Sequence, residues 1–263
     1  MDNRLLKTLI KSYKHNFLVD YYLMSYPKCG RTWLRVILGM YFKLKYDIHD
    51  IEPHELNKFW KKTKKIPFIY VSHGGRPAWQ KPSEITLPKY LQNKKVVLLI
   101  RDPRDVTVSL FYHMKYRNMV FDGDISEFIR GAGGIESTIR YFNMYLENSK
   151  QIKELYIIKY EDLRNRTKTS LVNLLSFLGE YDIDIRAIED SIEYAKFNNM
   201  KARESSSQID SNANDPLKTF NKDDKRAFKV RKGIVGNYIN EFNDKDLNFV
   251  NESMYNLNDK FNY

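Results

Sequence analysis

The most constraining feature of the sequence is residues 26–34, YPKCGRTWL, which lie between an apolar run and an amphipathic segment. Residues 18–25 are short and rich in aromatic and aliphatic side chains, which favours a buried strand. Apolar side chains then recur at helical spacing to about Lys45, so a helix begins near Arg31 or Thr32. A strand that turns directly into a helix aims free backbone N–H groups and the positive end of the helix dipole at one point. The sequence therefore predicts a phosphate or sulfate site in this loop.

The side chains of the loop support an anion site. Lys28 and Arg31 bring positive charge, and Thr32 brings a hydroxyl. Gly30 lets the backbone approach an oxygen without an intervening Cβ. The loop lacks the GxxxxGK[ST] motif, which disfavours ordinary ATP or GTP chemistry with Mg²⁺. Because short motifs match by accident, an ordinary loop with solvated cations stays open as an alternative.

A cysteine-dependent phosphatase is a second interpretation of the same loop. Cys29 and Arg35 have the C-x5-R spacing that sets a thiolate and a phosphate-binding arginine around one loop. A thiol at a helix N-terminus beside Lys28 is expected to have a lowered pKa. Against this interpretation, Trp33 and Leu34 occupy positions where a backbone cradle needs small residues.

Composition bounds the remaining possibilities. A chain of 263 residues suits one α/β domain, and its net charge of +11 suits an anionic ligand, so a basic nucleic-acid-binding module is a third interpretation. The single cysteine excludes an internal disulfide and fits a reducing compartment. We see no long apolar run and no signal peptide, and we expect a soluble, cytoplasmic protein. His49 and His54 lie five residues apart, which does not bring two metal ligands to one helical face, so we predict no metal site.

A histidine follows the second apolar run. Residues 66–72 predict a strand, and His73 comes directly after it, followed by two glycines. The ends of parallel strands are where α/β sheets open their binding crevice. If the first two strands are parallel neighbours, His73 and Lys28 lie at the same sheet edge. A loop histidine with a structural hydrogen bond remains the alternative at this point.

A second strand-to-helix junction follows the clearest strand. Residues 95–100 are continuously apolar, as a strand covered on both faces must be. Arg101 lies at the strand end, Asp102 is placed to cap the next helix, and Pro103 is placed at its first position. Ser109 adds a hydroxyl two turns into that helix. Taken alone, this pattern indicates helix capping. Taken together with the similar first loop, it predicts a second anion site.

Three segments in this order resemble motifs of the cytosolic-type sulfotransferases. Residues 26–34 resemble the family's 5′-phosphosulfate loop, YPKSGTTWL, and residues 96–113 (VVLLIRDPRDVTVSLFYH) resemble its 3′-phosphate site. Residues 231–238 (RKGIVGNY) resemble its RKGxxGDW segment. The agreement extends over about residues 18–240, so chance agreement of all three is remote.

The resemblance implies a transferase that moves the sulfuryl group of 3′-phosphoadenosine 5′-phosphosulfate (PAPS) to a hydroxyl or amine. We expect an α/β fold, a P-loop kinase-like three-layer sandwich with a central, mainly parallel sheet, in one domain over residues 1–263. Residues 205–230 are polar and predict a mobile lid. The expected acceptor is a small molecule or saccharide, with no metal, nucleic acid or membrane involved. Because PAPS carries phosphate at two separated positions, its binding needs two anion sites, as this chain offers.

The resemblance also implies roles for individual residues. His73 would be the general base of an in-line displacement, and Lys28 would stabilise charge on the leaving phosphate. Trp33 would stack on adenine, and Arg101 and Ser109 would bind the 3′-phosphate. The full set of donor-binding residues implied by the resemblance is Lys28, Cys29, Gly30, Arg31, Thr32, Trp33, Arg101, Ser109, Tyr160, Arg231, Lys232 and Gly233.

The chain departs from the family pattern at several positions. Cys29 replaces the usual Ser of the loop, and Arg31 replaces its first Thr. Many members have Lys two residues before the histidine; Val71 stands here, and Arg76 is the candidate substitute cation. The family's adenine element is only partly matched, by AKFNNM at residues 195–200. The family's dimer motif is not reproduced, and neither the oligomeric state nor the identity of the acceptor follows from the sequence.

Overall fold

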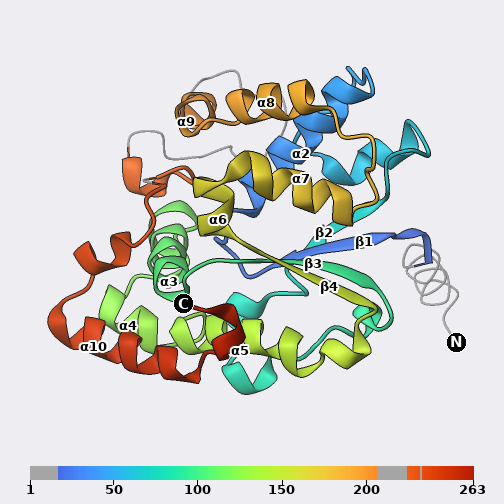
Figure 1. Ribbon diagram of the computed structural model, residues 1–263. Coiled ribbons are helices and arrows are strands. Elements are labelled where there is room, and N and C mark those ends of the chain that lie inside the picture. The colour runs from blue at the N-terminus through green and yellow to red at the C-terminus, as the bar shows by residue number, and fades with distance from the viewer. Residues whose placement is uncertain (1–16, 206–223, 232) are drawn as a thin grey trace, which may run out of the picture.

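A four-stranded parallel sheet organises the chain, with strand order β2-β1-β3-β4 (Figure 1). The computed structural model describes residues 17–205, 224–231 and 233–263. The strands are β1 (Tyr21–Ser25), β2 (Ile69–Ser72), β3 (Lys95–Ile100) and β4 (Glu154–Lys159). The predicted α/β class with a central, mainly parallel sheet is confirmed.

Helices cover both faces of the sheet, which confirms the three-layer sandwich (Figure 1). One face carries α2 (Arg31–Lys45), α6 (Tyr160–Asn165), α7 (Thr167–Phe177) and α8 (Ile185–Tyr194), with α9 (Phe197–Ser205) beside α8. The other face carries α3 (Pro103–Tyr112), α4 (Ile125–Arg130), α5 (Ile135–Glu147) and α10 (Asp244–Ser253). None of these described helices is long and apolar enough to cross a bilayer.

Short helical segments fill the connections. A π-helical turn, His113–Arg117, continues α3. The 3-10 segments are Leu56–Lys61, Pro77–Trp79, Pro82–Glu84, Lys89–Leu91, Ser149–Gln151, Lys225–Ala227, Asn237–Asn240, Met254–Asn256 and Asp259–Phe261. The middle of the predicted lid, residues 206–223, lies outside the described residues.

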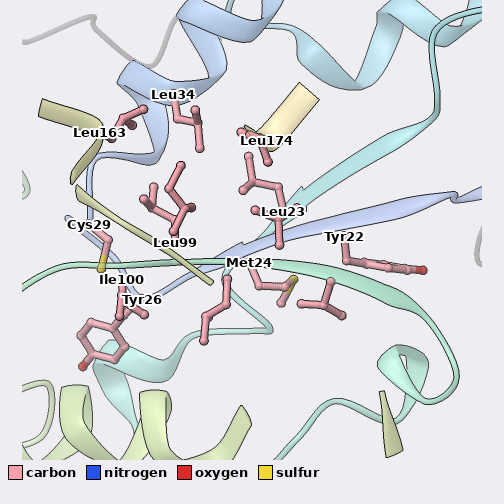
Figure 2. Close-up of a cluster of buried hydrophobic side chains, with 14 of the residues drawn as sticks. Tyr22, Leu23, Met24, Tyr26, Cys29, Leu34, Leu99, Ile100, Leu163 and Leu174 are labelled. Carbon is pink, nitrogen blue, oxygen red and sulfur yellow. The ribbon is translucent and has the colours of Figure 1, made fainter. Parts of the chain in front are cut away.

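The core lies on both sides of the sheet, and the two central strands run through it. All five residues of β1 are buried, and the last five of β3 are buried as well. Figure 2 shows side chains of both strands packed with Leu34 of α2, Leu163 of α6 and Leu174 of α7. Burial of these side chains away from water fixes the strands and therefore the loops at their ends.

The first two strands are shorter than their apolar runs predict. β1 begins at Tyr21 and β2 at Ile69, and these two residues are paired in the sheet. Just before that pair, the backbone N–H of Phe68 donates to the carboxylate of Asp20, 2.8 Å away, while the backbone N–H of Asp20 donates to the carbonyl oxygen of Phe68, 3.1 Å away. Phe17 and Leu18 are exposed rather than part of a strand.

The strand order positions a crevice between β1 and β3. These neighbours are parallel, yet α2, which follows β1, and α3, which follows β3, cover opposite faces of the sheet (Figure 1). The loops at their carboxyl ends therefore diverge, which is the point where sheets of this class bind ligands. His73 follows β2 on the other side of β1, at the same edge.

Candidate active site

A pocket at the carboxyl edge of the sheet brings together predicted site residues from the ends of all four strands and from the C-terminal loop. Among the residues that line it are Lys28, Gly30, Arg31, Thr32, Trp33, His73, Arg101, Ser109, Tyr160, Arg231 and Gly233. Two predicted residues are missing from this set. Cys29 does not line the pocket, and Lys232 lies outside the described residues.

The first loop has the backbone of an anion cradle. Lys28 has a φ of 74° and Gly30 a φ of 91°, both in the left-handed region. Cys29, between them, does not have a positive φ. Such alternation turns successive N–H groups toward one point. Burial lowers the pKa of Lys28 well below its usual value, and the nearby cations Lys229 and Arg117 lower it further. A buried ammonium among cations is stabilised as a charge when an anion occupies the pocket.

Gly30 is required for packing as well as for its backbone conformation. A Cβ at Gly30 would lie 2.5 Å from the ring of Tyr160, which follows β4. We expect Gly30→Ala to lower the free energy of unfolding by about 1–3 kcal/mol more than Gly236→Ala. Gly236 is the matched control, because its φ of 76° is also left-handed and a Cβ there would meet nothing within 4 Å. If urea denaturation gave the two variants equal losses in the free energy of unfolding, the close approach of Gly30 to Tyr160 would be unimportant for stability.

His73 is held in one tautomer by its two neighbours. Its Nδ1 lies 2.7 Å from the carbonyl oxygen of Ser25, and its Nε2 lies 2.6 Å from Nη2 of Arg31. A carbonyl only accepts and a guanidinium only donates, so Nδ1 carries the proton and Nε2 the lone pair. Burial and then the charge of Arg31 lower the pKa of His73 to about 3. His73 is therefore neutral at physiological pH, with its basic nitrogen on the side of Arg31.

The second strand-to-helix junction has the predicted cap. The side chain of Asp102 accepts a hydrogen bond from the backbone N–H of Arg104, 2.9 Å away, at the start of α3. Arg101 lies over the ring of Tyr160, with its guanidinium carbon 4.6 Å from the ring centre. Its Nη2 also lies 3.3 Å from a carboxylate oxygen of Asp105. Arg101 and Ser109 both reach the pocket, so the two predicted anion sites open into one cavity.

A buried carboxylate ties the C-terminal loop to this junction. Asp105 accepts hydrogen bonds from the backbone N–H groups of Gly236, at 2.8 Å, and Tyr238, at 3.2 Å. These bonds bring Arg231 and Gly233 of the same loop to the pocket.

Aromatic and apolar side chains form part of the pocket wall. The indole nitrogen of Trp33 donates to the carbonyl oxygen of Ala195, 2.8 Å away. The rings of Trp33 and Tyr160 meet edge-on, with their centroids 5.9 Å apart. Phe197 and Met200 also line the pocket. The partly matched segment 195–200 therefore does reach the site.

Cys29 is not placed to be a nucleophile. Its side chain is fully buried and points into the core beside Tyr26 and Ile100 (Figure 2). Burial raises the pKa of the thiol, so the predicted lowering is wrong. Arg35 donates to the backbone carbonyl of His54 and does not line the pocket. The phosphatase interpretation is therefore wrong, because the loop turns the thiol away from the cavity that holds the cations.

We expect Cys29 to resist thiol reagents in the folded protein. Labelling by a thiol-reactive disulfide should be negligible under native conditions and complete in denaturant, because the sulfur is fully buried. Cys29→Ser should keep the pocket chemistry but lose about 1–2 kcal/mol of stability, because it buries a hydroxyl among apolar side chains. Rapid native labelling would contradict this placement.

Several residues of the pocket were not predicted from the sequence. Lys229 and His113 line the pocket, as does Arg164. A signal existed for two of them: His113 lies one helical turn after Ser109, and Arg164 one turn after Tyr160, so each shares a helix face with a predicted residue. Lys229 lies in an irregular segment and offered no comparable signal.

The predicted substitute cation is in the wrong place. Arg76 is exposed and does not line the pocket. Arg31 and Lys229 bring charge to the pocket instead. His49 lies at the surface, with Nε2 2.8 Å from a carboxylate oxygen of Asp47. The part of the chain that the structure describes contains no group of residues suited to hold a metal ion.

Comparisons with known proteins agree with this geometry. The family model described as "Sulfotransferase domain" matches residues 18–261. Sulfotransferase 1E1 of Bos taurus is 24% identical over 247 residues, covering 85% of this chain and 78% of the relative. The amine sulfotransferase of Oryctolagus cuniculus is 26% identical over 239 residues, covering 83% of this chain and 74% of the relative. The crystal structure of mouse sulfotransferase SULT7A1 complexed with PAP shares the fold, with a TM-score of 0.60 at 22% identity, covering 90% of this chain and 84% of that one.

Proposed function

Because the chain belongs to the sulfotransferase domain family, we propose that it transfers the sulfuryl group of PAPS to a hydroxyl or amine of an acceptor. The observation that carries the proposal is the single pocket in which two strand-to-helix anion sites and a neutral histidine meet. Each site has a cation at its strand end, Lys28 in one and Arg101 in the other. A ligand with one phosphate would leave one of them idle.

The donor's two ends match the two sites. We assign the 5′-phosphosulfate to the first loop, where the backbone of Gly30 and Arg31 and the hydroxyl of Thr32 accompany Lys28. We assign the 3′-phosphate to Arg101 and Ser109, with Arg231 and Gly233 beside it. The adenine would lie along the aromatic wall of Trp33, Tyr160 and Phe197. The mouse structure crystallised with PAP, the donor without its sulfuryl group, supports this choice of nucleotide.

The proposed chemistry is an in-line displacement at sulfur. The acceptor oxygen or nitrogen attacks the sulfur, and the bond from sulfur to the phosphate oxygen breaks with its electron pair going to PAP. Lys28 stabilises the negative charge that develops on that oxygen. Nε2 of His73 accepts the acceptor's proton, and the carbonyl of Ser25 holds the ring in the tautomer this requires.

Two further expectations remain proposals. We propose a small-molecule or saccharide acceptor. Because one relative is named an amine sulfotransferase, we include amines among the candidate acceptors. We also propose a cytoplasmic location, which the single cysteine of the chain supports.

Labelled PAPS tests the proposed function directly. The full chain is incubated with sulfur-labelled PAPS and separate pools of phenols, saccharides and amines, while PAP binding is measured by calorimetry. We expect PAP to bind and label to move to one pool. The nucleic-acid alternative predicts salt-sensitive oligonucleotide binding that PAP does not displace, and this result without PAP binding would overturn the proposal.

A further inference from the structure

Arg31 lines the pocket, and one of its nitrogens is unpaired within the described part of the chain. One of its terminal nitrogens, Nη2, contacts His73, but Nη1 is buried and has no hydrogen-bond partner among the described residues. Burial and then the charge of Arg35 lower the pKa of Arg31 to about 10. Buried polar groups are nearly always hydrogen-bonded, so Nη1 of Arg31 is a donor available to an oxygen of a bound ligand.

The contact between Arg31 and His73 also blocks the proposed base. Nη2 of Arg31 donates to Nε2 of His73, the nitrogen that must accept the acceptor's proton. With this bond in place, the lone pair is occupied and the charge of Arg31 opposes protonation of the ring. Catalysis through His73 therefore requires Arg31 to take another partner.

An oxyanion in the pocket would supply that partner. Arg31 begins α2 directly after the first loop, beside Lys28 and Gly30, and all three line the cavity. Burial and then the charges of Arg117 and Arg31 lower the pKa of Lys229, which lines the same cavity, so Arg31 and Lys229 lie near each other. An anion between the first loop and His73 would face both. A guanidinium binds sulfate-like oxygens through two parallel N–H bonds, which a lysine cannot do.

We propose that Arg31 is a further catalytic residue, which binds the oxygens of the transferring sulfuryl group and thereby releases Nε2 of His73. This inference rests on the proposed function and deepens it. In the empty pocket Arg31 holds the base; with the donor bound it moves to the sulfuryl oxygens, so the base becomes available only when the donor is present. Arg31 gives up no proton: the acceptor's proton goes to His73, and the electron pair of the broken S–O bond goes to PAP.

Binding measurements without acceptor test the contact to the sulfuryl group. PAPS has that group and PAP lacks it, so Arg31→Thr should weaken PAPS binding by about tenfold to a hundredfold, the worth of one charge-assisted contact. Binding of PAP should change by less than about threefold. The matched control is Arg35→Thr, which removes the same charge one helical turn later, at a side chain outside the pocket. It should leave the ratio of the two affinities unchanged.

A second measurement follows the base itself. NMR titration of His73 in the unliganded protein should show its pKa rising from about 3 in Arg31→Thr, because the charge of Arg31 is removed, and should show less change in Arg35→Thr. An unchanged pKa of His73 would overturn the proposed hold on the base. Equal weakening of PAPS and PAP, or of neither, would overturn the contact to the sulfuryl group. Wild-type protein that binds neither nucleotide would instead overturn the proposed function, and this inference with it.

Discussion

Replacing Lys28 with methionine is expected to lower the rate of sulfuryl transfer by about a hundredfold to a thousandfold. Lys28 is held in a left-handed backbone conformation that few non-glycine residues adopt, inside a pocket rich in positive charge. A strained backbone conformation of this kind persists only where the surrounding contacts hold it in place. Because charge on the leaving phosphate grows only as the S–O bond breaks, the loss should fall mainly on kcat rather than on KM.

Single-turnover and steady-state rates with PAPS would measure this effect. Lys58→Met is the control. Lys58 pairs with Glu55 at the surface and does not line the pocket, so this substitution removes the same charge elsewhere. The control should keep near-normal rates. If Lys28→Met raised KM for PAPS and left kcat unchanged, Lys28 would bind the donor without stabilising the leaving group.

His73→Ala is expected to lower kcat by about a hundredfold to ten-thousandfold, the usual contribution of a positioned base. His49→Ala is the matched control, because His49 is exposed and far from the pocket lining. Unfolding midpoints would be compared, since the loss of the contacts to Ser25 and Arg31 also affects packing. Full activity in His73→Ala would exclude His73 as the base.

The pH dependence should carry the signature of the lowered pKa of His73. In the free protein His73 stays neutral down to about pH 3, so kcat/KM for PAPS, which reports on the free protein, should not fall between pH 8 and 5.5 on account of this group. An unperturbed imidazole, with a pKa of about 6.5, would lose about nine-tenths of its activity by pH 5.5. Lys229 has a pKa lowered to about 7 by burial and loses its charge above that pH. The profile is therefore also measured in Lys229→Met, which leaves His73 in place.

Local patterns in the sequence predict much of this fold. Strand β3 and the start of α2 lie where apolar runs and helical spacing place them, because these signals depend on neighbours a few residues away. The Asp102 cap likewise follows from the order of adjacent residues. The two strand-to-helix junctions could therefore be located without the structure.

Contacts between distant segments could not be predicted in the same way. Cys29 is adjacent to Lys28 in sequence, yet the turn of the loop directs one side chain into the core and the other into the pocket. The contact of Arg31 with His73 joins the loop after β1 to the end of β2, and no periodic signal describes it. Lys229 reaches the pocket from an irregular segment that is held by Glu204, which accepts from its backbone N–H at 2.6 Å.

The central claim, that one pocket binds both ends of a doubly phosphorylated adenosine, is tested most directly by calorimetry with three nucleotides. PAP, adenosine 5′-phosphate and adenosine 3′-phosphate are titrated into the wild-type protein, Lys28→Met and Arg101→Met. We predict that PAP binds at least about a hundredfold more tightly than either monophosphate, since each lost phosphate gives up charge-assisted contacts. Arg101→Met should weaken PAP but not adenosine 5′-phosphate, and Lys28→Met should weaken PAP but not adenosine 3′-phosphate. Equal affinity for all three nucleotides, or the same response of both monophosphates to both variants, would contradict the account.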